Sequence, residues 1–362
     1  MKRVDLPLPK SYAQCDIHQL RALMALLTDA SKRIGLSQLR KFDNLEYKMA
    51  AFFRLARLEV VEPADETKPI DKQHYICRLI PYTIAEERKW HGLYHRMRRL
   101  YSWLRRKVLG DDDTFPLYVW QINYWLLSVD GRGKKKVGVL DWIVSQSTDL
   151  YAYPLETMRL RHGLHRETFR CPPPLMDGFS WHRYRMAQDY MEMYVNRSNR
   201  LLQLQRRGAK VTRREVEQAI KDVDIARAMF LATVFERKID YTDETGIKRH
   251  GFRYHKEQVS DTMTFFRSFP DTDWQIMLVW WSSQMQYLSR TYPKVFKRQD
   301  TANKRNNPLE IYTRTTATIE KYLHITAEEV DNEPYTTIIQ QLQDMILRNE
   351  EMERINKKSG KN

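Results

Sequence analysis

The sequence predicts a mainly α protein, a multi-helix globular fold with a small β hairpin near residues 57–80. Apolar residues recur at helical spacing in many segments, and alternation typical of strands is found in two short stretches near that hairpin. The chain has only 12 glycines in 362 residues, about half the usual share, which leaves little material for strained turns. With 42% hydrophobic residues, it can bury a real core.

The N-terminal region is expected to contain two helices and the hairpin. The segment Asp16–Leu27 carries its apolar side chains on one face, with Asp16 as the N-cap, and Leu45–Leu58 shows the same spacing. Alternation over residues 57–62 and again over 75–80 predicts two strands joined by a long polar loop.

A long basic helix is expected next. It begins at the capping box Thr83–Glu86 and extends to about Leu109, with an apolar stripe continuous enough to be a buried face. The acidic run Asp111–Asp113 is interpreted as a solvated loop. An aromatic-rich segment follows from Tyr118 to Val129, and Lys134–Lys136 is interpreted as a basic loop.

The middle of the chain is interrupted by the rigid, non-helical segment Cys171–Pro174. Beyond it, a helix is expected from Ser180 to about Arg207. The capping box Thr212–Glu215 then opens a helix that continues from Val216 to Phe235. A short strand is expected at Ile247–Tyr254.

The clearest helix of the sequence begins at Pro270–Asp273 and ends at Pro293. Its apolar positions follow helical spacing, and a buried core face is the favoured interpretation. The alternative is a groove for a partner, because Trp, Tyr and Met are favoured at interfaces. The candidate partner-binding residues of this stripe are Trp274, Trp281, Met285 and Tyr292.

The C-terminal region reads as a helical tail behind a polar linker at residues 303–308. Its apolar stripe over 338–355 is too narrow for a helix that is stable alone, so it must dock on the body or on another chain. The expected domains are an N-terminal helical region with the hairpin (1–110), a central helical domain with the Pro-rich break at 171–174 (111–298), and the tail (299–362).

The charge balance points to anionic partners or surfaces: 61 Lys+Arg against 46 Asp+Glu give a net charge of +15. The three cysteines, Cys15, Cys77 and Cys171, are odd in number and far apart, which suits a reducing compartment. No apolar run reaches the length of about 18 residues that a membrane span requires, so none is expected.

Neither an enzymatic activity nor a cofactor is expected, because the sequence shows no nucleophile elbow, phosphate loop or paired-carboxylate pattern. Two histidine pairs, His91 with His95 and His162 with His165, have spacing compatible with a metal. Their basic and aromatic neighbours favour exposed or capping histidines instead, so no metal is expected.

Arginines concentrate on both sides of the proline-rich break, interleaved with Phe169, Trp181 and Tyr184. Guanidinium contacts to phosphates and stacking on bases would bind nucleic acid. The alternative is that these arginines solvate one face of helices whose aromatic residues are core. The candidate nucleic-acid-binding residues are Arg159, Arg161, Arg166, Arg170, Arg183 and Arg185.

Three parts of the chain carry a family resemblance. They are Leu8–Tyr12 followed by Asp16–Leu23, then Phe179–Ala187 with Tyr190, and finally Trp280–Trp281 with Thr291–Phe296. These stretches resemble tail-assembly chaperone-like and associated structural proteins of phages, prophages and contractile systems.

The resemblance implies a non-enzymatic assembly or structural role in a phage-type tail or contractile particle, in the cytoplasm or within the particle. Aromatic and basic helix faces would be presented to partner subunits. The alternative function is non-sequence-specific nucleic-acid binding through the arginine-rich surface, and the oligomeric state is left open.

Overall fold

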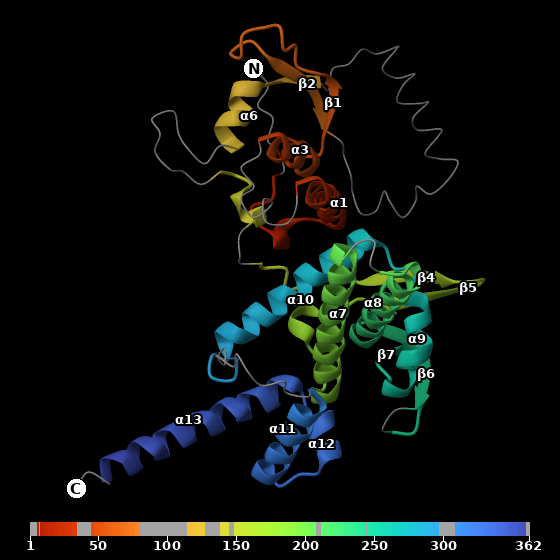
Figure 1. Cartoon of the computed structure of the whole chain (residues 1–362), viewed down its shortest axis with the longest axis vertical. Coiled ribbons are helices and arrows are strands. Elements are labelled where there is room, and N and C mark those ends of the chain that lie inside the picture. Colours follow the sequence, from red (N-terminus) through yellow and green to blue (C-terminus); the bar gives the residue numbers. More distant parts are fainter. Residues whose placement is uncertain are drawn as a thin grey trace. The chain divides into compact units, whose positions relative to one another are not determined.

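The computed structural model describes residues 6, 8–34, 45–79, 114–126, 138–144, 148–207, 211–242, 245–296 and 308–359. The chain forms two compact units, Met1–Asp149 and Leu150–Asn362, each described here by itself (Figure 1). The expected domain boundaries after residues 110 and 298 lie within these units, outside the described residues. Also outside them lie the expected basic helix 83–109 with His91 and His95, the acidic run 111–113 and the basic loop 134–136.

In the first unit, helix α1 (Ile17–Ile34) begins where the sequence places its cap. The Asp16 Oδ1 accepts hydrogen bonds of 2.9 Å from the backbone amides of His18 and Gln19. These bonds satisfy two of the amides that a helix start leaves without partners. Fully buried leucine and phenylalanine side chains pack α1 against α3 (Leu45–Leu55).

The expected hairpin is part of a three-stranded sheet. Strands β1 (Leu58–Glu62) and β2 (His74–Leu79) pair antiparallel, and β2 also pairs with β3 (Thr114–Tyr118). Helix α6 (Val119–Leu126) follows β3 directly. Strand β3 was not predicted, because Pro116 stands in the middle of its five residues. The structure accommodates this proline because β3 is an edge strand of the sheet.

Two short 3₁₀ helices complete the described part of the first unit, η1 (Tyr12–Gln14) and η2 (Asp141–Val144). The Tyr12 hydroxyl donates a hydrogen bond of 2.7 Å to the carbonyl oxygen of Ile143 and so joins the two ends of the unit.

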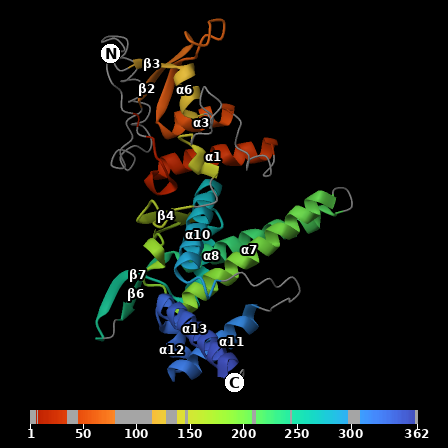
Figure 2. The same cartoon turned by 90° about the vertical axis from the view of Figure 1, so that its left-hand side faces the viewer.

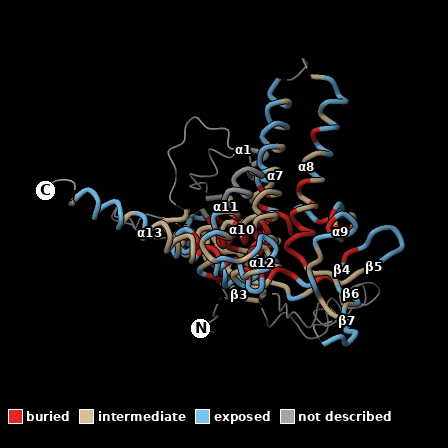
Figure 3. Tube along the Cα trace, turned by 90° about the horizontal axis from the view of Figure 1, so that it is seen from below, coloured by how far each residue is buried: buried red, intermediate tan, exposed pale blue. Residues whose placement is uncertain are grey.

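The second unit is built around two long antiparallel helices, α7 (Trp181–Arg207) and α8 (Arg213–Val234), which run side by side (Figure 2). Both ends of each helix lie within two residues or so of their predicted positions. The predicted capping box at Thr212 and Glu215 is present, with both reciprocal hydrogen bonds formed. The base of this helical hairpin is buried, whereas its far end is exposed (Figure 3).

A four-stranded antiparallel sheet lies beside the helical hairpin. Its strands, in spatial order, are β4 (Thr157–His162), β5 (His165–Arg170), β6 (Glu236–Thr242) and β7 (Lys248–Arg253). Of these, only β7 was predicted from the sequence. The prediction of a single small hairpin was therefore wrong, although the fold is mainly α.

One face of the four-stranded sheet, called here the inner face, packs against helix α9 (Val259–Phe266). The contact is aromatic: the ring of Phe266 lies 5.0 Å from the rings of Phe169 and Phe235. The 3₁₀ turns η3 (Pro174–Met176) and η5 (Lys256–Gln258) flank this region. Helix α10 (Asp271–Thr291) follows and buries one face in the core of the unit.

Three C-terminal helices follow, α11 (Pro308–Leu323), α12 (Ala327–Asn332) and α13 (Tyr335–Ser359). The junction of α12 and α13 docks on the start of α7: the rings of Tyr335 and Tyr184 stack 4.9 Å apart, and the Trp181 amide donates to the Glu333 carbonyl at 2.7 Å. The C-terminal segment therefore packs in cis. None of the described helices has the length and apolar character needed to cross a bilayer.

Candidate nucleic-acid interface

The β4–β5 hairpin forms because its side chains alternate between two environments. Met158 and Leu160 point to the inner face and are buried, whereas Arg159 and Arg161 between them are exposed. Alternation with a period of two is the pattern of a half-buried strand. At the turn, Gly163 has a φ of 59°, the conformation that glycine adopts without steric cost.

The strand register places four of the six candidate arginines on the opposite, outer face of the sheet. Arg161 lies directly opposite Arg166, Arg159 opposite Thr168, and Arg170 opposite Thr157. All four arginines are exposed. The outer-face residues of β4 and β5 are thus threonine or arginine, without a carboxylate. We call Arg159, Arg161, Arg166 and Arg170 the basic face.

The same face of β6 carries one further cation, Lys238, between the carboxylates Glu236 and Asp240. Lys238 is exposed and pairs with Phe252 across the two strands, on the same side as Arg170. The guanidinium of Arg170 lies 5.0 Å from the centre of the Phe252 ring. The alternation of Ile239 and Tyr241 with polar residues could have indicated this strand. Without a strand prediction, the sequence does not show on which face Lys238 lies.

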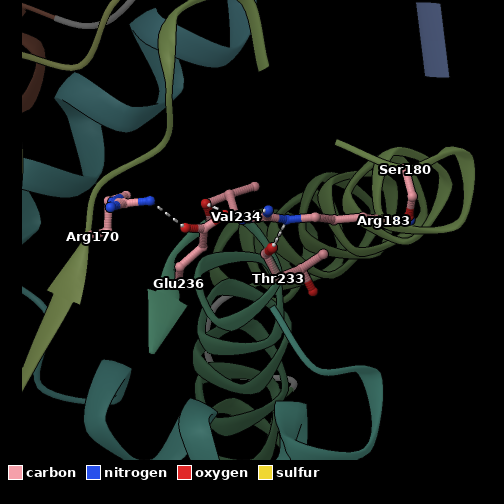
Figure 4. Close-up of polar contacts among 6 residues, drawn as sticks. All are labelled: Arg170, Ser180, Arg183, Thr233, Val234 and Glu236. Carbon is pink, nitrogen blue, oxygen red and sulfur yellow. Dashed lines mark hydrogen bonds and ion pairs between the residues drawn. The ribbon is translucent and has the colours of Figure 1, made fainter. Parts of the chain in front are cut away.

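Glu236 of β6 borders the basic face and pairs with Arg170 (Figure 4). Its Oε2 lies 3.4 Å from Arg170 Nη1, and its Oε1 lies 2.9 Å from Arg183 Nη1. The carboxylate is therefore shared by an exposed arginine and a buried one. Beyond this edge, no carboxylate of the described residues pairs with Arg159, Arg161 or Arg166.

Arg183 is a structural residue, and its assignment to nucleic-acid binding is corrected. Its side chain is only 3% exposed. Its Nε and Nη2 donate to the carbonyl oxygens of Thr233 and Val234 at 2.9 and 3.0 Å, the last carbonyls of α8 (Figure 4). A guanidinium at this position satisfies carbonyls that a helix end leaves unpaired and complements its negative pole.

Aromatic rings enclose the same guanidinium. Its central carbon lies 3.8 Å from the centre of the Phe179 ring and 5.0 Å from that of Tyr254. Burial lowers the pKa of Arg183, and the neighbouring Glu236 raises it. Burial also raises the pKa of Tyr254 to about 12, so this phenol stays neutral beside the cation.

Replacing Arg183 by leucine is expected to destabilise the second unit by about 1–3 kcal/mol, because two buried carbonyls lose their donor. The matched control is Arg185→Leu. Arg185 bonds Gln188 at 2.7 Å and pairs with Asp189 at 3.6 Å, both on its own helix. Its loss leaves no helix-end carbonyl without a donor, so the control is expected to cost much less. Urea denaturation followed by circular dichroism compares the two. Equal losses would contradict the capping role.

The candidate partner-binding residues of α10 divide into buried and half-buried members. Trp274 is buried and donates from its Nε1 to the Tyr194 hydroxyl at 3.0 Å. Trp281 is also buried, with its ring 5.2 Å from that of Phe230. These two are core residues of the unit and are not available to a partner. Met285 and Tyr292 are half-buried.

The histidines of the β4–β5 hairpin lie together on the inner side of its turn. His162 and His165 lie opposite each other beside the turn, and the His162 ring lies 5.8 Å from that of Phe265. Within the described residues, no group of three His, Cys, Asp or Glu side chains is placed to hold a metal ion.

Comparison of the chain with protein families, characterised proteins and solved structures gave no match.

Proposed function

We propose that this protein binds nucleic acid without sequence specificity through the basic face of its second sheet. The observation that carries the proposal is the cross-strand pair Arg161 and Arg166. Like charges directly opposite each other on neighbouring strands destabilise a sheet. Arg161 also donates from its Nε to the carbonyl oxygen of Gly163 at 2.7 Å, which supports the turn. The repulsion between the two guanidinium groups remains, and a bound phosphate would relieve it.

The geometry favours recognition of the phosphate backbone. Arg159 and Arg161 are two residues apart on β4, so their Cα atoms are separated by roughly 6.6 Å along the strand. This regular row suits a polymer of phosphates. Phe252 on this face lies under Arg170 and is half-buried, so it is not an open surface for stacking on bases. Phosphate contacts position nucleic acid but carry no sequence information.

The test replaces Arg159, Arg161 and Arg166 together by glutamine. Each arginine that contacts a phosphate contributes about 1 to the slope of log affinity against log salt. The triple variant is therefore expected to lower that slope by about 3 and to weaken binding to all sequences alike. Fluorescence anisotropy with labelled oligonucleotides between about 50 and 200 mM salt measures both quantities.

The matched control replaces Arg206, Arg207 and Arg214, three exposed arginines at the far end of the α7–α8 hairpin, by glutamine. Both triple variants change the net charge equally, so only a contact through the basic face separates them. Without nucleic acid, the sheet variant is expected to be as stable as the parent or slightly more so. No binding by the parent at low salt, or equal losses in both variants, would contradict the proposal.

A second candidate is the assembly or structural role in a phage-type particle, supported by helix α13. This helix continues beyond its buried start, and its exposed far half carries Leu347, Met352 and Ile355 (Figure 1). Exposed apolar side chains on a projecting helix suit contact with another subunit. Either role would be exercised in the cytoplasm or inside a particle.

Cross-linking of purified phage-type particles tests this second candidate. Cross-links from Lys357 or Lys358, near the end of α13, to another particle subunit support it. If the chain is found neither in particles nor in assembly intermediates, the candidate is wrong.

A further inference from the structure

The end of the β4–β5 hairpin is a two-stranded ribbon, whose inner side contacts α9 through the rings of His162 and Phe265. Strand β5 pairs with β6 only through Phe169 with Arg237 and Arg170 with Glu236. The two hairpins then diverge, and residues 161–166 extend past the rest of the sheet (Figures 1 and 3). We call residues 161–166 the ribbon tip.

The ribbon tip combines four basic side chains with one apolar side chain. Arg161 and Arg166 lie on one side of the ribbon, and His162 and His165 lie on the other. At the apex stands Leu164, whose side chain is 89% exposed and is the most exposed of the large hydrophobic residues described. The apex of this basic hairpin is therefore an exposed leucine.

The turn itself does not require a leucine. Gly163 supplies the positive φ of 59° at the first central position, and Leu164 has no such demand on its backbone. Two-residue hairpin turns with glycine first are normally completed by small polar residues such as Asn or Ser. Leu164 is therefore not the residue type that this turn favours, and its side chain is not buried at this position.

On the basis of the proposed function, we propose that the ribbon tip enters the minor groove of duplex DNA. The arginines contact the flanking phosphates, and Leu164 acts as a wedge between adjacent base pairs. Proteins that bend DNA insert apolar side chains in this way, which partly unstacks a base step and kinks the duplex. The narrow minor groove also has a strong negative potential that attracts arginine. A wedge requires stacked base pairs, so the expected ligand is double-stranded DNA.

A membrane surface would also attract cations around an exposed leucine, but the structure favours DNA. Stable interfacial binding needs a broad apolar face or several hydrophobic side chains in addition to the charge. The ribbon tip offers a single leucine with no aromatic residue beside it. Binding to anionic vesicles is therefore included in the test as a competing outcome.

The experiment measures DNA bending with a duplex of roughly 20–30 base pairs that carries a fluorophore at each end. The whole chain is expected to bring the ends closer and raise energy transfer, with a bend of roughly 20–90°. The variant Leu164→Ser is expected to keep its affinity within about tenfold, because the phosphate contacts remain, but to lose most of the bend. Leu202→Ser is the matched control, since Leu202 is an exposed leucine of α7 outside the ribbon; it should bend DNA like the parent.

The outcomes separate this inference from the function on which it rests. Absence of DNA binding by the parent chain overturns both. Binding with the same bend in the parent and in Leu164→Ser overturns the wedge and leaves nucleic-acid binding standing. A third result would also overturn the wedge: tighter binding to phosphatidylserine vesicles than to the duplex, lost in Leu164→Ser. Loss of the bend in Leu164→Ser alone supports it.

Discussion

Replacing Trp281 by alanine is expected to lower the free energy of unfolding of the second unit by about 3–5 kcal/mol. The side chain is only 7% exposed and its ring meets that of Phe230 edge-on, at 5.2 Å and 84°. Phe230 also lies 5.7 Å from Trp274, so the three rings form one packed cluster between α8 and α10. Truncation leaves a cavity, because the close-packed structure around a deleted core side chain relaxes only partially.

The control for this substitution is Trp120→Ala, which makes the same chemical change at a side chain that is 48% exposed on α6. It is expected to cost far less, since surface substitutions usually change stability by about 0.5 kcal/mol or less. Urea denaturation followed by far-ultraviolet circular dichroism compares both variants with the parent. If Trp281→Ala were as stable as the parent, the assignment of this face of α10 to the core would be wrong.

Truncation of the chain after Gln299 is expected to destabilise the second unit so far that it melts at a lower temperature or aggregates. The deleted helices supply part of its core. Tyr335 is 2% exposed and Ile338 is fully buried. The Tyr335 hydroxyl also donates at 2.6 Å to the carbonyl oxygen of Leu175. Their removal exposes the rings of Trp181 and Tyr184 at the start of α7.

A shorter truncation after Arg348 is the control for this deletion. It removes the exposed far half of α13 and keeps the buried start. The ion pair of Lys294 with Glu350, 2.5 Å between Nζ and Oε2, is lost, but a partly exposed pair contributes about 1 kcal/mol or less. This variant should melt close to the parent. A stable body after truncation at Gln299 would instead show that the C-terminal helices are a separable tail.

The helices of the second unit could be predicted because their signals are local. The stripe that starts at Trp274 predicts a helix from Pro270–Asp273 to Pro293, and α10 runs from Asp271 to Thr291. The capping box at Thr212 likewise marks the start of α8. A cap and an apolar period each involve residues within a few turns, so the sequence carries them directly.

Three strands of the second sheet were not predicted, because few of their positions are apolar and the residues between them are mostly charged. In β4 the apolar positions Met158 and Leu160 are separated by arginine, and in β6 only Ile239 and Tyr241 alternate with polar residues. The register that brings Arg161 opposite Arg166 depends on a turn whose geometry the residue types suggest but do not specify. The alternative interpretation, in which these arginines solvate helices, is therefore wrong for Arg159, Arg161, Arg166 and Arg170, which lie on a sheet.

The fate of Arg183 could not be read from the sequence for a different reason. Arg183 and Arg185 are two residues apart on the same helix and look equivalent in the sequence. The carbonyls that Arg183 caps belong to Thr233 and Val234, about fifty positions later. Only the packing of α8 against α7 distinguishes the buried arginine from the half-buried one.

Hydrogen–deuterium exchange with and without a DNA duplex tests the central claim, that the basic face is the nucleic-acid surface, most directly. We expect slower amide exchange in peptides covering residues 157–170 when DNA is bound at low salt. The far end of the α7–α8 hairpin around residues 200–214 should not change. Protection confined to that helical end, or no protection in β4 and β5 under conditions where anisotropy shows binding, would contradict the claim.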